Sequence, residues 1–247
     1  NRRLLWKIKI KMYSFENDVP FIYFGPCKTA SSSIDVALNT HTKNPKGKHV
    51  SVHNKTQRFE ISRHHVVKID ESSTCSLAES KIDAISSKNL KKVFKFASIR
   101  SPYDRIFSYF SYRKYGRGQS IGMTDLIPID TFEVFIDWIY NNKHYLEEEL
   151  LPIDSPLAGY IFDIKPMLDW ISLEDGTVII DEYVRFENLE DDWKKIVNEK
   201  LLLESSLLNH YNWSKRPKDY KVAYNDNIRK KVEKIYEKDL DYFKYTF

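Results

Sequence analysis

The stretch FASIRSPYDRIFSYFSY fills residues 96–112 and joins a predicted strand to a predicted helix. The apolar run VFKFASI at 93–99 is typical of a buried strand, and Pro102 suits the first turn of a helix that Ser101 caps. Asp104 follows the cap by three residues, so the helix start resembles a capping box. One apolar helix face follows, formed by Tyr103, Ile106, Phe107 and Phe110. This strand–turn–helix pattern indicates an α/β fold.

The same junction carries groups that bind anions. Arg100 follows the strand directly and offers a bidentate fork, and Ser108 lies two helical turns further on. The N–H groups at a helix start and the helix dipole also attract negative charge. A surface salt-bridge set of Arg100, Asp104 and Arg105 is the alternative explanation.

A second strand-to-helix turn lies earlier in the chain, where FIYFG at 21–25 is followed by PCKTA and SSSIDVAL. Its Lys28-Thr29 pair invites comparison with the nucleotide-binding P-loop, which requires G-x-x-x-x-G-K-[ST]. Here Gly25 precedes Lys28 by only three residues, so the turn is too short to wrap a triphosphate in the same way. It still offers these candidate residues to one phosphate: Lys28, Thr29, Ala30, Ser31, Ser32 and Ser33. A serine-capped helix with an exposed lysine explains the same residues.

The rest of the chain alternates predicted strands with predicted helices. Strands are predicted at 64–69 and 177–186, with an edge strand or basic arm within residues 1–18. Helices are predicted at 76–85, 132–141 and 187–201, and along a C-terminal stripe of Ile228, Val232, Ile235, Tyr236 and Leu240. We therefore expect one domain over 1–247, with a central, mainly parallel sheet flanked by helices. Ligands bind such sheets at the carboxyl ends of the strands, so the two turns are expected to face one crevice.

Composition is typical of a packed globular protein. The chain has 247 residues, 42% of them hydrophobic, and a formal net charge of +4. That charge fits an anionic ligand, but 39 Lys+Arg against 35 Asp+Glu is too balanced to indicate nucleic acid. Cys27 and Cys75 are most simply free thiols, with one disulfide as the alternative. No apolar run approaches the roughly 18 residues of a membrane span. The expected location is the cytoplasm, or the Golgi lumen if an N-terminal anchor was removed.

On its two turns the chain resembles the sulfotransferase superfamily, in particular the membrane-type and bacterial carbohydrate branch. In that superfamily a K-[TS]-x-[GS]-[TS]-[ST] turn holds the 5′-phosphosulfate of 3′-phosphoadenosine 5′-phosphosulfate (PAPS), and an R-x-P-x-x-R-x-x-S-x-Y segment holds its 3′-phosphate. The resemblance implies that residues 28–33 take the first role and that Arg100 and Ser108 take the second. It also implies a P-loop-NTPase-like three-layer fold. Cys27 and Ser31 depart from the usual proline and glycine of the first turn.

Later segments extend the resemblance over most of residues 20–247. The segment VRFENLEDDW at 184–193 is similar to the family's strand with its F-E-N-L helix start, and 209–226 and 235–245 are similar to its closing segments. In the first closing segment, Lys215 and Arg216 are candidates to close over the adenosine phosphates or to steer an anionic acceptor. A solvated basic loop is the alternative.

The resemblance implies in-line transfer of a sulfuryl group from PAPS to a hydroxyl or amine of a small-molecule or carbohydrate acceptor, with 3′,5′-adenosine bisphosphate (PAP) as the other product. Lys28 is the candidate cation for the leaving oxygen, and no metal is required. His65, and next His64, are candidate general bases because they border the predicted strand at 64–69. Two loop histidines without a role and a zinc site are the alternatives, although no Cys/His spacing supports zinc.

Two other functions compete with sulfuryl transfer. An ATP-dependent P-loop small-molecule kinase would need a full Walker loop and a magnesium-binding carboxylate, and neither is evident in the sequence. A non-catalytic module that binds adenosine bisphosphate or RNA is the other rival. The balanced charge and the absence of an RNA-binding aromatic signature weaken it.

Overall fold

The computed structural model describes residues 12–14, 21–41, 94–115, 127–147, 156–172, 176–203, 207–209 and 216–247. They belong to two compact units. Unit 1 comprises Asn1–Pro26, Ala30–Ile99 and Asp169–Tyr211, and unit 2 comprises Cys27–Thr29, Arg100–Leu168 and Asn212–Phe247. The predicted strand at 64–69 and the predicted helix at 76–85 lie outside the described residues. The expectation of a single domain over 1–247 stays a prediction.

Unit 1 contains a four-stranded sheet in the order β1-β2-β3-β4. Its strands are β1 Met12–Ser14, β2 Phe21–Phe24, β3 Phe94–Ile99 and β4 Glu182–Arg185. The edge strand β1 pairs antiparallel with β2, while β2, β3 and β4 pair in parallel. The predicted strands at 21–25 and 93–99 are therefore confirmed. The strand predicted at 177–186 is shorter than expected, because only Glu182–Arg185 pairs with β3.

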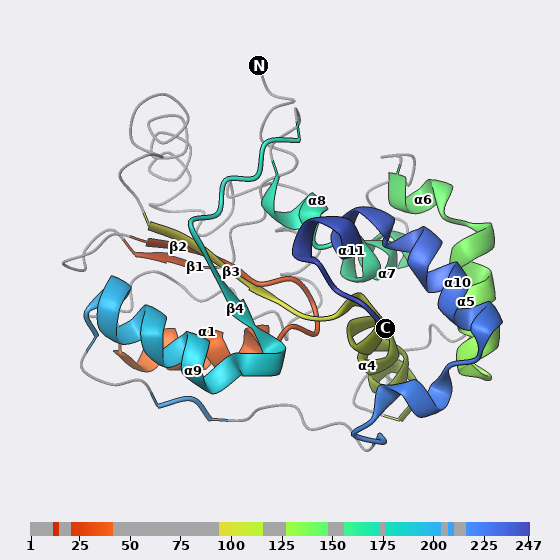
Figure 1. Ribbon diagram of the computed structural model, residues 1–247, viewed down its shortest axis with the longest axis horizontal. Coiled ribbons are helices and arrows are strands. Elements are labelled where there is room, and N and C mark those ends of the chain that lie inside the picture. The colour runs from red at the N-terminus through yellow and green to blue at the C-terminus, as the bar shows by residue number, and fades with distance from the viewer. Residues whose placement is uncertain are drawn as a thin grey trace. The chain divides into compact units, whose positions relative to one another are not determined.

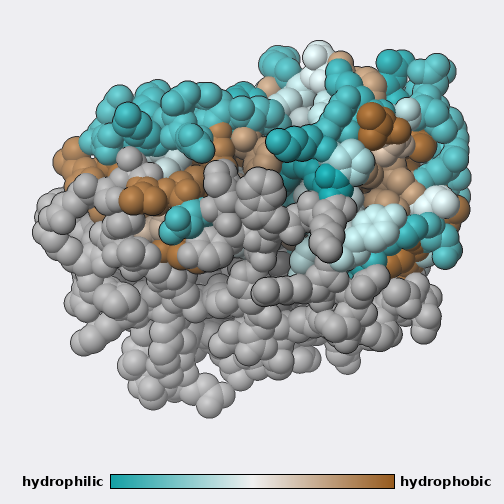
Figure 2. Space-filling view, turned by 90° about the horizontal axis from the view of Figure 1, so that it is seen from below, coloured by the Kyte–Doolittle hydropathy of each residue, from teal (hydrophilic) through white to brown (hydrophobic). Residues whose placement is uncertain are grey.

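Two helical segments and a π-helix cover one face of this sheet. Helix α1 spans Ser31–His41, α9 spans Leu189–Lys195 and the π-helix Ile196–Leu201 continues α9. In Figure 1, α1 and α9 lie together below the strands. Their apolar side chains form one buried cluster with the sheet: Phe21, Tyr23, Ile34, Leu38, Phe96, Val184, Trp193 and Val197. Seen from below, the described surface is largely hydrophilic, with smaller apolar patches (Figure 2).

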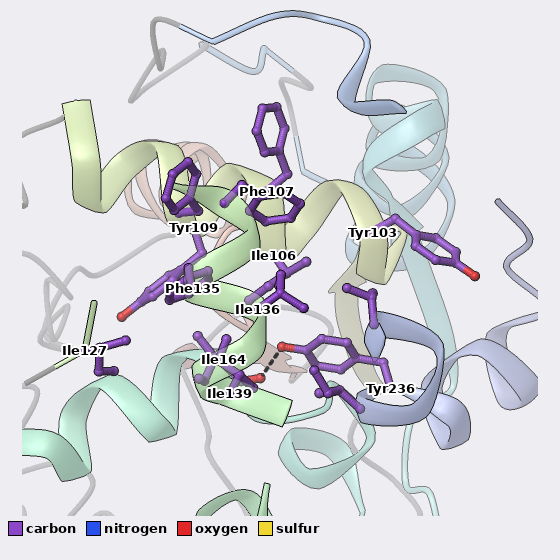
Figure 3. Close-up of a cluster of buried hydrophobic side chains, with 14 of the residues drawn as sticks. Tyr103, Ile106, Phe107, Tyr109, Ile127, Phe135, Ile136, Ile139, Ile164 and Tyr236 are labelled. Atoms are coloured by element: carbon purple, nitrogen blue, oxygen red, sulfur yellow. Dashed lines mark hydrogen bonds between the residues drawn. The ribbon is translucent and has the colours of Figure 1, made fainter. Parts of the chain in front are cut away.

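Unit 2 is helical. It contains α4 Pro102–Tyr115, α5 Phe132–Asn141, α6 His144–Glu147, α7 Pro156–Ile164, α10 Asp226–Ile235 and α11 Glu237–Phe243, with a 3-10 helix at Tyr220–Ala223. Helix α5 begins where Thr131 caps it, because the Thr131 hydroxyl accepts the N–H of Val134 at 3.2 Å. Figure 3 shows Ile106 and Phe107 of α4 gathered with Phe135, Ile136 and Ile139 of α5 in one buried cluster. The predicted apolar face of α4 is confirmed.

The C-terminal stripe forms two helices instead of the one predicted helix. α10 ends at Ile235, and α11 starts at Glu237 after a break at Tyr236. The Tyr236 hydroxyl donates to the carbonyl of Ile164 at 2.8 Å (Figure 3). Asp239, which is fully buried, accepts the N–H groups of Met167 at 2.7 Å and Leu168 at 2.9 Å. The closing segment 235–245 therefore fixes the turn that follows α7.

The α/β architecture with a mainly parallel sheet flanked by helices is confirmed, and it agrees with a P-loop-like three-layer fold. The short helix α8, Leu168–Ile171, and the 3-10 helix Phe186–Asn188 complete the described elements. Within the described ranges, no helix is long and apolar enough to cross a membrane.

Candidate active site

The two turns singled out in the sequence are joined by a hydrogen bond. The Nη1 group of Arg100, which follows β3, donates to the carbonyl of Lys28 at 2.9 Å. Both residues belong to unit 2. The Arg100 side chain is buried, so this contact lies away from bulk solvent. The expectation that the two turns lie close together is confirmed for these two residues.

The first turn has a backbone suited to an anion. Lys28 and Ala30 adopt φ of 69° and 65°, while Thr29 between them does not have a positive φ. Such alternation directs successive N–H groups toward one side, as in the concave backbone sites that bind phosphate. A left-handed conformation is costly for residues that have a Cβ, and strain of this kind concentrates at functional sites. The conformation therefore supports an anion-binding role for residues 28–30.

The hydroxyl residues of the first turn continue into α1. Ser31, Ser32 and Ser33 form the first positions of that helix, and the Ala30 carbonyl accepts the N–H of Ser33 at 2.9 Å. Thr29 is fully buried. Ser31, which stands where the family usually has glycine, has no positive φ. The backbone conformation at this position therefore does not require glycine.

A carboxylate joins two arginines at the start of α4. Arg100 donates through Nε at 2.9 Å and through Nη2 at 2.6 Å to one oxygen of Asp104. Arg216 places Nη1 at 2.8 Å from the other oxygen. All three side chains are largely buried, with relative exposures of 4%, 12% and 11% for Arg100, Asp104 and Arg216. The capping-box role expected of Asp104 is thus replaced by a pair of ionic contacts.

Lys28 reaches the same side of α4 two turns further along. Its Nζ lies 4.4 Å from the centre of the Tyr112 ring. Positions 104, 108 and 112 are spaced by four residues, so their side chains share one side of the helix. Ser108, which is 4% exposed, lies midway between the arginines and the lysine. The predicted residues Lys28, Arg100, Ser108 and Arg216 are therefore brought to one side of one helix.

The environment of Lys28 changes its acidity. Burial, with Arg100 and Arg216 nearby, lowers the pKa of Lys28 from 10.5 to about 8, and Cys27 and Asp163 oppose the shift. At neutral pH most Lys28 side chains still carry a proton. The result is a cation that is only partly hydrated and has no carboxylate within salt-bridge distance in the described part of the chain. Such a cation attracts an anionic ligand strongly.

Several polar groups on this side of α4 have unused hydrogen-bonding capacity. Within the described ranges, the Ser108 hydroxyl and the Lys28 ammonium group make no hydrogen bond. Arg216 uses only Nη1, toward Asp104 and toward the Pro217 carbonyl at 3.4 Å. Buried donors normally find partners, so this arrangement fits an anion that would accept from them.

A family model supports this interpretation over almost the whole chain. The model described as "Sulfotransferase family" matches residues 12–246. The chain belongs to the sulfotransferase family. No curated protein and no solved structure matches it in the corresponding comparisons. An enzyme of this family transfers a sulfuryl group to an acceptor.

Arg105 has a structural place in the sulfotransferase. Its guanidinium donates to three carbonyls, those of Cys27 at 3.0 Å, Asp163 at 2.8 Å and Lys165 at 2.8 Å. It also lies 5.9 Å from the centre of the Tyr236 ring. The surface salt-bridge set considered for Arg100, Asp104 and Arg105 is therefore wrong for Arg105, which binds backbone, and the Arg100–Asp104 pair is buried.

Some predicted site residues of the sulfotransferase remain unplaced. His64, His65 and Lys215 lie outside the described residues, as does Cys75, while Cys27 is a free, buried thiol. Sequence analysis did not single out the ring of Tyr112 as a platform for Lys28 or the bridging role of Asp104. The four-residue spacing from Asp104 through Ser108 to Tyr112 was the available signal.

Proposed function

We propose that the sulfotransferase uses PAPS as donor and transfers its sulfuryl group to a hydroxyl or amine of a small-molecule or carbohydrate acceptor. The observation that carries this proposal is the pair of cationic positions along one side of α4. Arg100 and Arg216 meet at Asp104, and Lys28 lies over Tyr112. Ser108 lies between them.

The spacing of these positions suits a ligand with two separate anionic groups. Eight residues of helix from Asp104 to Tyr112 cover about 12 Å along the axis. PAPS has a phosphate on its 3′ oxygen and a phosphosulfate on its 5′ oxygen, whereas ATP has a single linear triphosphate. Two separated cationic positions therefore favour PAPS over the ATP of a kinase. The unused donors of Ser108 and Arg216 fit the same ligand.

Each candidate residue has a role in this proposal. Arg100, Ser108 and Arg216 bind the 3′-phosphate, with Lys215 as a further candidate. The turn holds the 5′-phosphosulfate through Lys28, Thr29, the backbone of Ala30, Ser31, Ser32 and Ser33. The strained backbone at Lys28 and Ala30 supports this role.

Lys28 also has a chemical role. When bound, the donor supplies an activated sulfuryl group, whose transfer leaves negative charge on the departing oxygen. The Lys28 ammonium stabilises that charge, and the Tyr112 ring keeps the ammonium in position. The acceptor proton passes to a general base, for which His65 and next His64 are the candidates.

Ligand binding to the full chain tests the donor. Calorimetry is run with PAP, with 5′-AMP and with ATP plus magnesium. We expect PAP to bind most tightly, and at about 100 times its dissociation constant to raise the free energy of unfolding by roughly 2.7 kcal/mol. Stabilisation by ATP–magnesium alone would mean that the donor is wrong. Incubation with labelled PAPS and a panel of acceptors then identifies the acceptor class.

A matched pair of serines tests the 3′-phosphate position. Ser108→Ala removes a hydroxyl with no hydrogen bond in the described part of the chain, and PAP affinity should fall about tenfold, the value of one hydrogen bond to a charged group. Ser111→Ala is the control, because that hydroxyl already donates to the Phe107 carbonyl at 2.8 Å. Equal effects of the two substitutions would contradict the assignment of Ser108.

A further inference from the structure

Asp104 is an acidic residue at the proposed position of a phosphate. A carboxylate weakens the attraction for an anion, so its presence among the arginines needs a physical reason. Each of its oxygens faces a different guanidinium, Arg100 at 2.6 and 2.9 Å and Arg216 at 2.8 Å. The carboxylate therefore lies between two cations that come from distant parts of the sequence.

We propose that Asp104 is a positioning residue that holds Arg100 and Arg216 side by side as a two-arginine clamp for the 3′-phosphate of the donor. The inference rests on the proposed function. Asp104 does not bind the ligand in this proposal. It fixes the orientation of the two groups that do.

Electrostatics explains why a carboxylate is suited to this task. Two guanidinium groups close together repel each other, and largely buried charges require partners. Asp104 supplies a shared counter-charge, so the three side chains together keep one net positive charge. Lys28 adds a second positive charge nearby, because Arg100 and Arg216 both affect its pKa. The net positive charge is retained for a phosphate dianion while the repulsion between the arginines is offset.

Geometry explains why the orientation matters. An arginine has a planar fork that binds phosphate in a bidentate manner only when its plane is correctly aimed. Arg100 is held on a second side by the Lys28 carbonyl at 2.9 Å. Arg216 is held by the Phe107 ring, whose centre lies 5.6 Å from the guanidinium carbon. With Asp104 as the shared contact, little rotational freedom remains to be lost when the phosphate binds.

The inference predicts an effect on ligand preference and not on binding in general. In Asp104→Asn, which has nearly the same shape, we expect PAP affinity to fall about 10- to 100-fold, as for the loss of charge-assisted contacts. The affinity for 5′-AMP, which lacks the 3′-phosphate, should change less than twofold. Asp104→Glu keeps the charge and should restore part of the preference for PAP.

Calorimetry with PAP and 5′-AMP on the full chain measures both affinities. A merely structural role of Asp104 would lower both affinities together and leave their ratio unchanged, which would overturn the inference. A rise in PAP affinity would also overturn it, because the carboxylate would then act only as a repulsive charge. If the wild-type chain itself binds PAP no better than 5′-AMP, the proposed function fails before Asp104 is tested.

A second variant covers the case in which Asp104→Asn does not fold. Arg216→Gln removes one arm of the clamp but leaves the Arg100–Asp104 contact in place. It should lower the ratio of PAP to 5′-AMP affinity by about tenfold, for one lost contact to a charged group. An unchanged ratio would show that Arg216 is no part of the clamp and would overturn the inference.

Discussion

The ammonium group of Lys28 lies 4.4 Å from the centre of the Tyr112 ring. The lysine comes from the turn after β2, and the tyrosine comes from the fourth turn of α4. The contact thus places the cation beside the helix that also presents Ser108. A cation over an aromatic ring gains about 0.5–2 kcal/mol, depending on its solvation.

Replacement of Tyr112 should change the acidity of Lys28. Tyr112→Phe keeps the ring and should leave the pH profile of kcat/KM unchanged. Tyr112→Leu removes the attraction that favours the protonated lysine, so the alkaline limb should move to lower pH by up to about one unit, because one unit corresponds to 1.36 kcal/mol. The measurement is kcat/KM for PAPS between pH 6 and 10. Identical profiles for the two variants would contradict a role for the ring.

Sulfuryl transfer should decline as the pH rises through about 8. Burial lowers the pKa of Lys28 to about 8, so its positive charge is present below that pH and lost above it. The profile of kcat/KM reports this group in the free enzyme. Lys28→Arg is the control, since a guanidinium stays protonated throughout, and its alkaline limb at pH 8 should disappear. A wild-type rate that increases steadily through pH 8 would argue against Lys28 as the cation.

Lys28→Met should stabilise the protein while it abolishes transfer. The lowered pKa means that the folded state carries a cost of about 3 kcal/mol for keeping this lysine protonated below pH 8. Loss of the contact with Tyr112 offsets part of the gain, so we expect a net increase of about 1–3 kcal/mol at pH 7. Between pH 8 and 10.5 the unfolded chain binds the extra proton, so wild-type stability should rise and the difference should shrink. Urea unfolding at pH 7 and pH 10 measures both effects. A Met variant less stable than wild type at pH 7 would refute the cost.

Asp239→Asn should destabilise the fold with little effect on donor affinity. The fully buried carboxylate accepts two backbone N–H groups, from Met167 and Leu168, and an amide accepts them less strongly and must bury its own N–H groups. We expect a loss of about 2–4 kcal/mol in urea unfolding. Asp241→Asn is the matched control on the same helix, where the side chain is exposed and the change should stay within about 0.5 kcal/mol. Similar losses in both variants would show that the N–H contacts are not the cause.

The sequence predicts those elements whose ends have a strong local signal. Helix α4 begins at Pro102 and α5 begins after Thr131 as expected, because proline and a capping hydroxyl act within one turn. The strand predicted from 177 was too long. The Thr177–Ile180 side chains are only half-buried, and the Asp181 carboxylate accepts the N–H of Lys95 at 2.8 Å, while pairing with β3 starts at Glu182. Apolar periodicity alone does not reveal which residues find a partner strand.

The site was predictable where the topology dictates it. Neighbouring parallel strands end at the same edge, which is why Lys28 and Arg100 meet. The contact of Arg216 with Asp104 was not predictable, because it depends on the tertiary path of the C-terminal segment. A sequence also does not distinguish an Asp104 that caps a helix from one that binds Arg100 at i−4, since both need the same residue at the same place.

Arg105 is bound only through neutral acceptors, the carbonyls of Cys27, Asp163 and Lys165. Neither a guanidinium nor a peptide carbonyl titrates in the working range of an enzyme, and buried hydrogen bonds are poorly screened by ions. The link between the start of the first turn and the end of α7 should therefore survive both mild acid and molar salt. Amide hydrogen exchange at these segments would then stay slow under conditions that loosen contacts between charged side chains.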